Sequence, residues 1–411
     1  MTENNQKTYK VFCVTMPASG HCIPLYPILN ELIEKHKNVE VIVYTAESRR
    51  KDFENVGAKY KNLIYDEGIH SKGISETNTV QVSIFERFTR IVRVARNNCY
   101  QIARDINREK PDLIIYDYTL PARFFNLIML YYRKRYEEGQ KMANQTTNST
   151  RFIPTHPLPP MIGFSPAFIF EPGLFPNKEE FAIMMKRMKF SFSVFWQLII
   201  YFFTLFKFCF EFGLGYINPF SLRTMGSTPE TKLVISSIFR DLQPRAHLYD
   251  SKRFKFIGST VNESINNNIV YSAIKDEQIK KLLEKFETVN KDQNEKLIYV
   301  SLGTVFNTKI NIFKTIFDAF KTFDQEPDLT KSRIKLNDLK VIVSTGDKIY
   351  NRFEELKRTN EYSLPDNIIL VKTAPQTEIL KKSALFVTHS GMNSTSESIN
   401  YAGKLILANL K

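Results

Sequence analysis

Cysteine and tryptophan are scarce in this chain, and neither a metal-binding pattern nor a secretion signal is visible. The 411 residues include four cysteines and one tryptophan. The cysteines are scattered, without a CxxC pair or another metal-ligand spacing, which is typical of reduced thiols in a cytosolic protein. Residues 1–10 are polar, with no apolar run of the kind that a secretory signal requires. We therefore expect a cytoplasmic protein without a metal site, in which the sequons at Asn144, Asn148 and Asn262 stay unmodified.

Acidic residues are outnumbered by basic ones. Lysine and arginine total 57, aspartate and glutamate total 43, and the formal net charge is +14. Such an excess favours anionic partners, among them nucleotide phosphates, acidic membranes and nucleic acid. The basic residues are spread along the chain rather than gathered in one recognisable module, so we expect no nucleic-acid partner. The length is sufficient for two domains with a core each, and 43% hydrophobic residues is a globular composition.

Short apolar runs alternate with helix-like segments twice along the chain. The strand candidates are residues 10–16, 39–44, 111–117, 297–300, 341–343, 368–371 and 385–388. Alternation of this kind predicts parallel sheets with right-handed crossovers. We expect an α/β protein with two doubly wound, Rossmann-like domains in series. The predicted first domain spans 1–243, the linker 244–254 and the second domain 255–411.

Two segments interrupt this alternation. Residues 133–160 are charged and then rich in Asn, Thr and Pro, which predicts a surface loop or insertion. Residues 190–217 form an apolar helical segment, whose part 190–206 carries no charge and is somewhat short for the roughly 20 residues that cross a bilayer. Two interpretations stay open, a buried or lid helix of the first domain and a helix that rests peripherally on a membrane surface.

A strand, a turn and a helix near the C-terminal end have the composition of an anion site. The apolar run 385–388 is followed by a polar turn with Gly391 and by a segment that can open a helix. The first N–H groups of a helix lack intrahelical partners and carry partial positive charge, so phosphate binds there. Side-chain donors at this turn are His389, Asn393, Ser394 and Thr395, and Glu397 is an acceptor suited to sugar hydroxyls. Alternatively, these residues only cap an ordinary helix.

Other polar residues fall where strands end, which is where doubly wound sheets bind ligands. They are His21, Asp117, Thr304, Ser344 and, after residues 368–371, Gln376. His21 is a candidate general base because histidine titrates near neutrality, and Asp117 could orient its ring if the two meet. Neither predicted sheet has GxGxxG at its first turn, which argues against a nicotinamide-dependent dehydrogenase.

Four motifs in a fixed order carry a resemblance to a known family. They are residues 16–24, 111–117, 299–307 and 374–397. Together they resemble the UDP-dependent glycosyltransferases, the family of the glucuronosyltransferases and plant flavonoid glucosyltransferases, and above all its macrolide-glycosyltransferase branch. The resemblance implies the GT-B fold of two facing Rossmann-like domains. The first would take the acceptor and the second the nucleotide sugar.

The resemblance also implies the reaction and the role of single residues. It is an inverting transfer of a hexose from a UDP-sugar to a hydroxyl of a small lipophilic acceptor, with His21 as general base and Asp117 orienting it. No cofactor or metal is implied, because oriented donors at a helix N-terminus can stabilise the leaving diphosphate. The implied diphosphate residues are Thr304, Ser344, His389, Gly391, Asn393 and Ser394, with Gln376 at the nucleobase and Glu397 at the ribose.

The chain departs from the family in three places. Thr373 stands where plant members carry a tryptophan that stacks on uracil, and Leu405 stands where the family usually has proline. The family continues beyond the position of Lys411 into an Asp–Gln pair that holds the donor sugar and into helices that cross back. We therefore expect a C-terminally incomplete second domain and little or no turnover. The alternative function is a nucleotide-sugar-binding relic without catalysis.

Overall fold

The computed structural model describes most of the chain, in segments. They are residues 7–65, 84–119, 124–142, 152–167, 169, 192–215, 229–260, 279–281, 283–284, 295–303, 310–321, 338–401 and 405–407. The described residues up to Thr260 form one compact unit, and those from Ile279 onward belong to a second. Each unit holds a parallel sheet of its own, so the α/β class and the two Rossmann-like sheets are confirmed.

The first unit is built on seven parallel strands in the order β3-β2-β1-β4-β5-β6-β7. They are β1 (Tyr9–Val14), β2 (Val39–Thr45), β3 (Lys59–Asn62), β4 (Leu113–Asp117), β5 (Met161–Ser165), β6 (Thr231–Ser236) and β7 (Phe254–Phe256). Strand β1 lies between β2 and β4, so the chain order reverses on its two sides. In doubly wound folds, ligands bind beyond the carboxyl ends of the strands at such a reversal.

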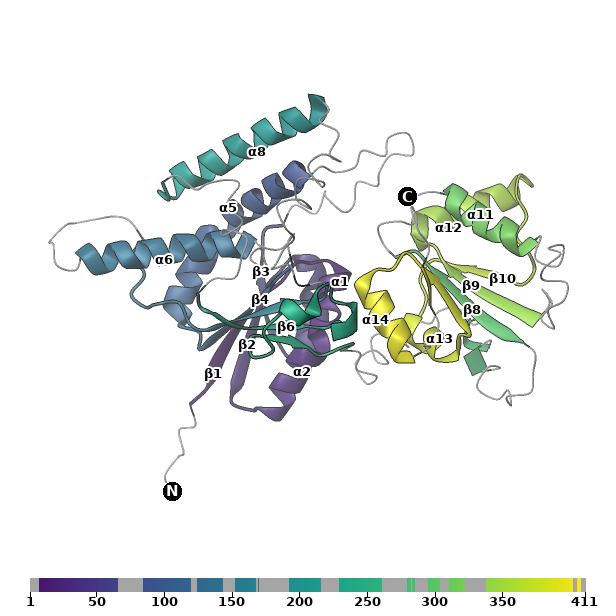
Figure 1. Cartoon of the computed structure of the whole chain (residues 1–411), viewed down its shortest axis with the longest axis horizontal. Coiled ribbons are helices and arrows are strands. Elements are labelled where there is room, and N and C mark those ends of the chain that lie inside the picture. The colour runs from purple at the N-terminus through teal and green to yellow at the C-terminus, as the bar shows by residue number, and fades with distance from the viewer. Residues whose placement is uncertain are drawn as a thin grey trace, which may run out of the picture. The chain divides into compact units, whose positions relative to one another are not determined.

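Helices cover both faces of this sheet, with α2 on one side and α5 and α6 on the other (Figure 1). The helices are α1 (Ser19–Cys22), α2 (Leu25–Lys35), α3 (Arg50–Asn55), α5 (Ile84–Glu109), α6 (Phe124–Met142) and α8 (Phe192–Glu211), and the 3₁₀ turns are η1 (Glu47–Arg49), η5 (Arg240–Leu242) and η6 (Ala246–Leu248). The last four residues of β1 are all buried, which explains its continuous apolar run. Helix α5 packs against both α6 and α8.

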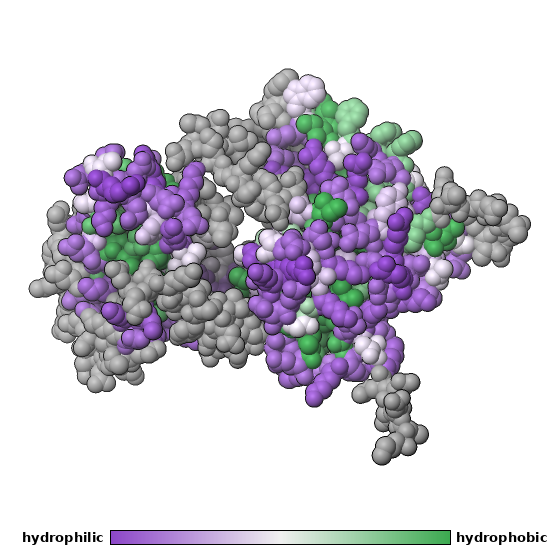
Figure 2. All heavy atoms as spheres, turned by 180° about the vertical axis from the view of Figure 1, so that it is seen from behind, coloured by the Kyte–Doolittle hydropathy of each residue, from purple (hydrophilic) through white to green (hydrophobic). Residues whose placement is uncertain are grey.

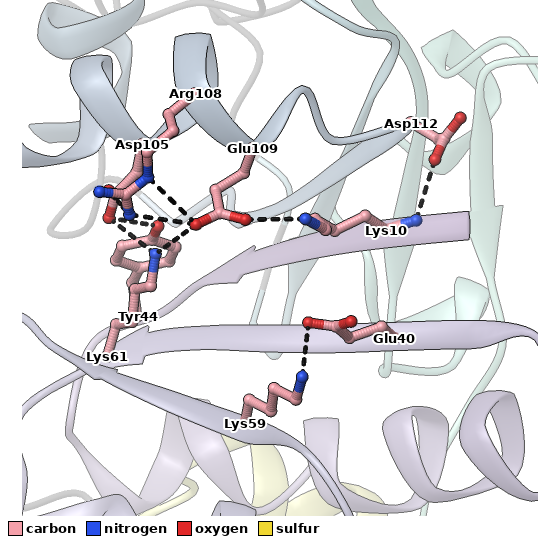
Figure 3. A network of polar contacts seen from close by, with 9 residues as sticks. All are labelled: Lys10, Glu40, Tyr44, Lys59, Lys61, Asp105, Arg108, Glu109 and Asp112. Carbon is pink, nitrogen blue, oxygen red and sulfur yellow. Dashed lines mark hydrogen bonds and ion pairs between the residues drawn. The ribbon is translucent and has the colours of Figure 1, made fainter. Parts of the chain in front are cut away.

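A network of polar contacts fastens the end of α5 to three strands of the first sheet (Figure 3). Lys10 of β1 pairs with Glu109 at 2.7 Å, Lys61 of β3 pairs with Asp105 at 3.0 Å, and the Tyr44 hydroxyl of β2 donates to Asp105 at 2.8 Å. The hydrogen bond from Lys10 is the main reason that the pKa of Glu109 falls from 4.5 to about 2. A lowered carboxyl pKa stabilises the fold above pH 4.5, and this contribution is lost as the pH falls toward 2.

The second unit repeats the arrangement with five parallel strands in the order β10-β9-β8-β11-β12. They are β8 (Lys296–Ser301), β9 (Leu339–Ser344), β10 (Ile368–Val371), β11 (Leu385–Thr388) and β12 (Leu405–Leu407). Its helices are α11 (Ile310–Lys321), α12 (Gly346–Arg358), α13 (Gln376–Lys382) and α14 (Met392–Tyr401). Strand β8 lies between β9 and β11, so this sheet has its own reversal of chain order.

The predicted loop at 133–160 is wrong over its first ten residues, because 133–142 continue helix α6. Tyr131, Tyr132 and Arg135 of this helix are buried. The Arg135 guanidinium donates a hydrogen bond to the Phe212 carbonyl at 2.9 Å. The charges read from the sequence therefore belong to a helix rather than to a loop. Residues 143–151 of this prediction lie outside the described residues, and 152–160 form no helix or strand.

The predicted linker at 244–254 is instead part of the first unit. Its last residue, Phe254, is buried and begins strand β7, which pairs with β6. The Tyr249 hydroxyl donates to the Ile169 carbonyl at 2.7 Å, and the neighbouring Gln243 amide bonds the N–H and the carbonyl of Ile169. These buried contacts could not be read from a segment that holds a proline and several charges, so the first unit extends to Thr260.

Helix α8 is the described part of the apolar segment that left two interpretations open. Its packing on α5 agrees with a helix of the first domain, and the contact with a membrane surface stays a prediction. One face is buried against α5, while large aromatic side chains on the other face are exposed. Within the described segments, no helix combines the length and the apolar character needed to cross a membrane. Residues 190–191 and 216–217 of the predicted segment lie outside the described residues.

Candidate functional site

The first unit brings His21 and Asp117 together at the reversal of its strand order. His21 lies in α1, directly after β1, and Asp117 is the last residue of β4. Strands β1 and β4 are neighbours in register, with Val14 opposite Tyr116, so their carboxyl ends lie side by side. The His21 Nδ1 atom is 2.5 Å from Asp117 Oδ2. The sequence predicted both residues, and their contact depends on the pairing of β1 with β4.

This geometry selects one tautomer of His21. A carboxylate oxygen only accepts hydrogen bonds, so Nδ1 must carry the proton that it donates to Asp117. The second nitrogen, Nε2, then presents a lone pair and can accept a proton from a hydroxyl group. Burial lowers the pKa of His21, but the charge of Asp117 and the hydrogen bond to it outweigh burial, so the net pKa is raised. A raised pKa makes the neutral ring a stronger base.

Thr119 supports the pair, and the sequence analysis missed it. Its hydroxyl donates to Asp117 Oδ1 at 2.7 Å, and its backbone N–H donates to the same oxygen at 3.1 Å. The other carboxylate oxygen, Oδ2, is thereby left to His21. The Asp117 side chain is 2% exposed, so its orientation is set by these bonds rather than by water. An Asp-x-Thr sequence at a strand end is an Asx-turn pattern and was the signal that could have identified this residue.

Arg49 holds the turn that carries His21. Its Nε donates to the Pro17 carbonyl at 2.8 Å, and its Nη2 donates to the Ser19 hydroxyl. The neighbouring Cys22 thiol donates to the Met16 carbonyl at 3.0 Å, and burial raises its pKa to about 12. A thiol with such a pKa is a structural group rather than a nucleophile. All four cysteines are free, as the scattered spacing predicted, and all four are buried.

In the second unit the strand register aligns the predicted site residues at one edge of the sheet. Ser301 of β8 pairs with Ser344 of β9 on one side and with Thr388 of β11 on the other. The residues that follow, Gly303 and His389, therefore leave the sheet at neighbouring positions, at the reversal of strand order. Ser344 lies at this edge as predicted, whereas Thr304 lies outside the described residues.

Two glycines make room for the His389 ring. A Cβ atom on Gly303 would lie 2.9 Å from His389 Nδ1, and one on Gly391 would lie 2.8 Å from Nε2. Real Cβ atoms essentially never approach so closely, and Gly303 also has a φ of +69° that side chains rarely adopt. Burial lowers the pKa of His389, so its ring is neutral near pH 7 and offers one N–H donor.

Helix α14 carries the other polar residues of this edge. Asn393 and Ser394 lie in its first turn, and Glu397 lies one turn further along. Gln376, the first residue of α13, donates from Nε2 to Glu397 Oε2 at 2.6 Å and to the Ser394 hydroxyl at 3.3 Å. Burial raises the pKa of Glu397 to about 7, while the Gln376 hydrogen bond lowers it less. Residues predicted for nucleobase, diphosphate and ribose thus share one cluster.

The described residues of this cluster do not form a set of metal ligands. Across the described segments of the chain, no group of three or more histidine, cysteine, aspartate or glutamate side chains is arranged to hold a metal ion. The polar groups of the second unit are instead amides, hydroxyls, one histidine and one carboxylate, combined with the N–H groups that open α14. Such a donor set suits a phosphate and the hydroxyls of a sugar.

Comparison with known proteins adds relatives by sequence and by fold. No protein-family model matches the chain. The uncharacterized UDP-glucosyltransferase YojK of Bacillus subtilis is 29% identical over 175 residues, which are 43% of this chain and 34% of that protein. The NDP-glycosyltransferase YjiC of Bacillus licheniformis is 29% identical over 176 residues, 43% of this chain and 35% of YjiC. The chain thus spans about a third of the length of these curated relatives.

A solved structure resembles nearly the whole chain. The glycotransferase of kitacinnamycin matches with a TM-score of 0.62 and 17% sequence identity, over 98% of this chain and 81% of that one. Two parallel doubly wound sheets with this similarity define a protein of the GT-B class. By sequence, the chain is similar to UDP- and NDP-glycosyltransferases of Bacillus over less than half of its length.

Proposed function

We propose that the chain transfers a hexose from a UDP-sugar to a hydroxyl of a small lipophilic acceptor, with inversion at the anomeric carbon. The observation that carries the proposal is the hydrogen bond between His21 and Asp117. A surface histidine needs no buried carboxylate to orient it, whereas a general base does. In this mechanism His21 Nε2 accepts the acceptor's proton while the acceptor oxygen attacks the sugar.

The second unit supplies the groups that the leaving diphosphate requires. Negative charge grows on the diphosphate as the bond to the anomeric carbon breaks, and preorganised donors stabilise it. The neutral His389 ring, the Ser394 hydroxyl and the N–H groups at the start of α14 are such donors. Glu397 would accept hydrogen bonds from the ribose hydroxyls, and Gln376 would remain within reach of the nucleobase. Attack opposite the leaving group converts an α-linked donor into a β-glycoside.

Replacement of the base tests this proposal. His21→Ala and Asp117→Asn should each lower the rate of UDP release by about 10²–10⁴-fold, the first by removing the base and the second by disturbing its tautomer. The measurement is UDP release from UDP-glucose in the presence of a panel of phenols and sterols. Calorimetric UDP affinity should stay unchanged, because neither residue lies in the nucleotide cluster.

His36→Ala is the matched control, since His36 is an exposed histidine at the end of α2. It should leave turnover unchanged. Turnover that survives His21→Ala would remove His21 as the base. A chain that binds UDP but shows no turnover with any donor and acceptor would favour the second function, a nucleotide-sugar-binding protein without catalysis.

A further inference from the structure

Helix α8 is anchored to the first unit by one of its faces. Tyr201 and Phe208 on that face are buried, and so is Phe212, directly after the last residue of the helix. The Tyr201 ring lies 5.7 Å from the Phe88 ring of α5, and the Phe212 ring lies 4.8 Å from Tyr100 of the same helix. The helix therefore presents a fixed opposite face, and that face cannot turn inward without breaking these contacts.

The opposite face is an aromatic stripe, defined by Phe195, Trp196, Ile200, Phe203, Phe206 and Phe210. Phe203, Phe206 and Phe210 are 70%, 69% and 82% exposed, the largest values among exposed hydrophobic residues in the described part of the chain. Other exposed hydrophobic residues lie outside α8: Leu248 ends η6, while Ile64 and Ile257 follow β3 and β7. Figure 2 shows hydrophobic residues gathered over the α8 segment. A contiguous apolar patch of this kind marks an interaction surface.

The charges around the stripe are positive. Lys207 is exposed and, at 100° per residue, points to the same side as Phe203 and Phe210. Glu211, the one acidic residue of α8, is paired with Arg96 of α5 at 2.5 Å. The Lys134 ammonium lies near Gly215, just beyond the end of the helix. A lysine within an aromatic face can extend its ammonium to anionic head groups while its stem stays in apolar surroundings.

We propose that α8 lies in the plane of an anionic lipid bilayer, with the aromatic stripe inserted at the head-group boundary. A spanning orientation is incompatible with the face that packs on α5. A second copy of the chain is disfavoured as the covering partner, because two chains of net charge +14 repel each other, whereas acidic lipid attracts them. Exposed Phe and Trp beside lysine have the composition of interfacial helices.

Trp196 provides a direct test, because it is the only tryptophan and belongs to the stripe. The protein should sediment with vesicles of phosphatidylcholine and phosphatidylserine but not with phosphatidylcholine alone. Trp196 emission should shift to shorter wavelength on binding and be quenched by brominated lipid. Absence of binding, an unchanged emission, or equal binding to neutral vesicles would overturn the proposal.

Substitutions on the stripe sharpen the test. Phe203→Ser/Phe210→Ser should weaken vesicle binding about 100-fold, and Lys207→Gln about fivefold. Leu248→Ser/Ile257→Ser is the control, since both residues are exposed and lie outside α8, and it should bind as the wild type does. Unchanged thermal melting would show that each variant is folded. A wild-type dimer in sedimentation velocity that Phe203→Ser/Phe210→Ser dissociates would instead assign the stripe to a second copy and overturn the proposal.

Discussion

The two units use the same topological position for different chemistry. In the first, the edge where β1 meets β4 holds two side chains in direct contact, His21 and Asp117, with Thr119 behind them. In the second, the edge where β8 meets β11 holds His389 between two glycines. A histidine base needs a carboxylate partner to set its tautomer, whereas an anion site needs backbone groups that can approach the anion closely. The comparison shows that strand order sets the location and the residues after each strand set the chemistry.

The largest expected effect comes from closing the space between the glycines. Gly303→Ala should weaken UDP-glucose binding roughly 100-fold, because the new Cβ displaces the His389 ring and an alanine at positive φ is strained. Gly57→Ala is the control in the first unit, where φ is +85° but the nearest side-chain atom is 3.4 Å from the new Cβ. It should cost about 1 kcal/mol of stability and leave binding unchanged. Calorimetry measures both, and wild-type affinity in Gly303→Ala would contradict the assignment of His389.

A smaller effect should follow from pH at the second edge. The pKa of Glu397 is raised to about 7, so below pH 7 the carboxyl is mostly protonated. Ribose hydroxyls donate to the ionised form, so binding should release a proton and weaken as the pH falls. UDP-glucose should bind about tenfold more weakly at pH 6 than at pH 8. Calorimetry in buffers of different ionisation enthalpy measures how many protons are released on binding. Glu397→Gln should remove the pH dependence, and a dependence that persists would assign it to another group.

The smallest expected effect tests the support of the base in the first unit. Thr119→Val removes the hydroxyl that donates to Asp117 and keeps the side-chain shape. Turnover should fall about fivefold, and the acidic limb of the kcat/KM profile should move to higher pH, because the Asp117 charge is then less dispersed and holds the proton on His21 more strongly. Thr119→Ser should restore both. A rate loss without a shift of the profile would indicate a purely structural role.

Much of the fold could be predicted from apolar runs alone. The runs at 297–300, 341–343, 368–371 and 385–388 correspond to β8, β9, β10 and β11, because strands buried on both faces read as continuous hydrophobic segments. The end of the first unit could not be predicted. Strand β7 is only three residues long, and the turns before it are held by Tyr249 and Gln243 through contacts with Ile169, far away in the sequence.

The candidate site, like the fold, has a part that could be predicted from the sequence and a part that could not. Motif order pointed to His21, Asp117, His389 and Glu397, each of which lies at the end of a strand or in the turn and helix that follow it. The role of Thr119 depends on a bond to the carboxylate two residues before it, and the raised pKa of Glu397 depends on its burial. An Asp-x-Thr pattern could have indicated Thr119, whereas Glu397 becomes buried only when α13 packs beside α14, so no residue pattern reports its pKa.

The sequence by itself determined which residues can do chemistry and, through their order, the family that the chain resembles. It also determined that residues 190–206 are rich in aromatic and aliphatic side chains and carry no charge. Only the tertiary structure decided which of these groups meet. Parallel pairing of β1 with β4 and of β8 with β11 brings together residues about 100 positions apart, at His21 and Asp117 and again at Gly303 and His389. Packing on α5 likewise decided which face of α8 remains exposed, because a helix can bury only the face that meets its neighbour.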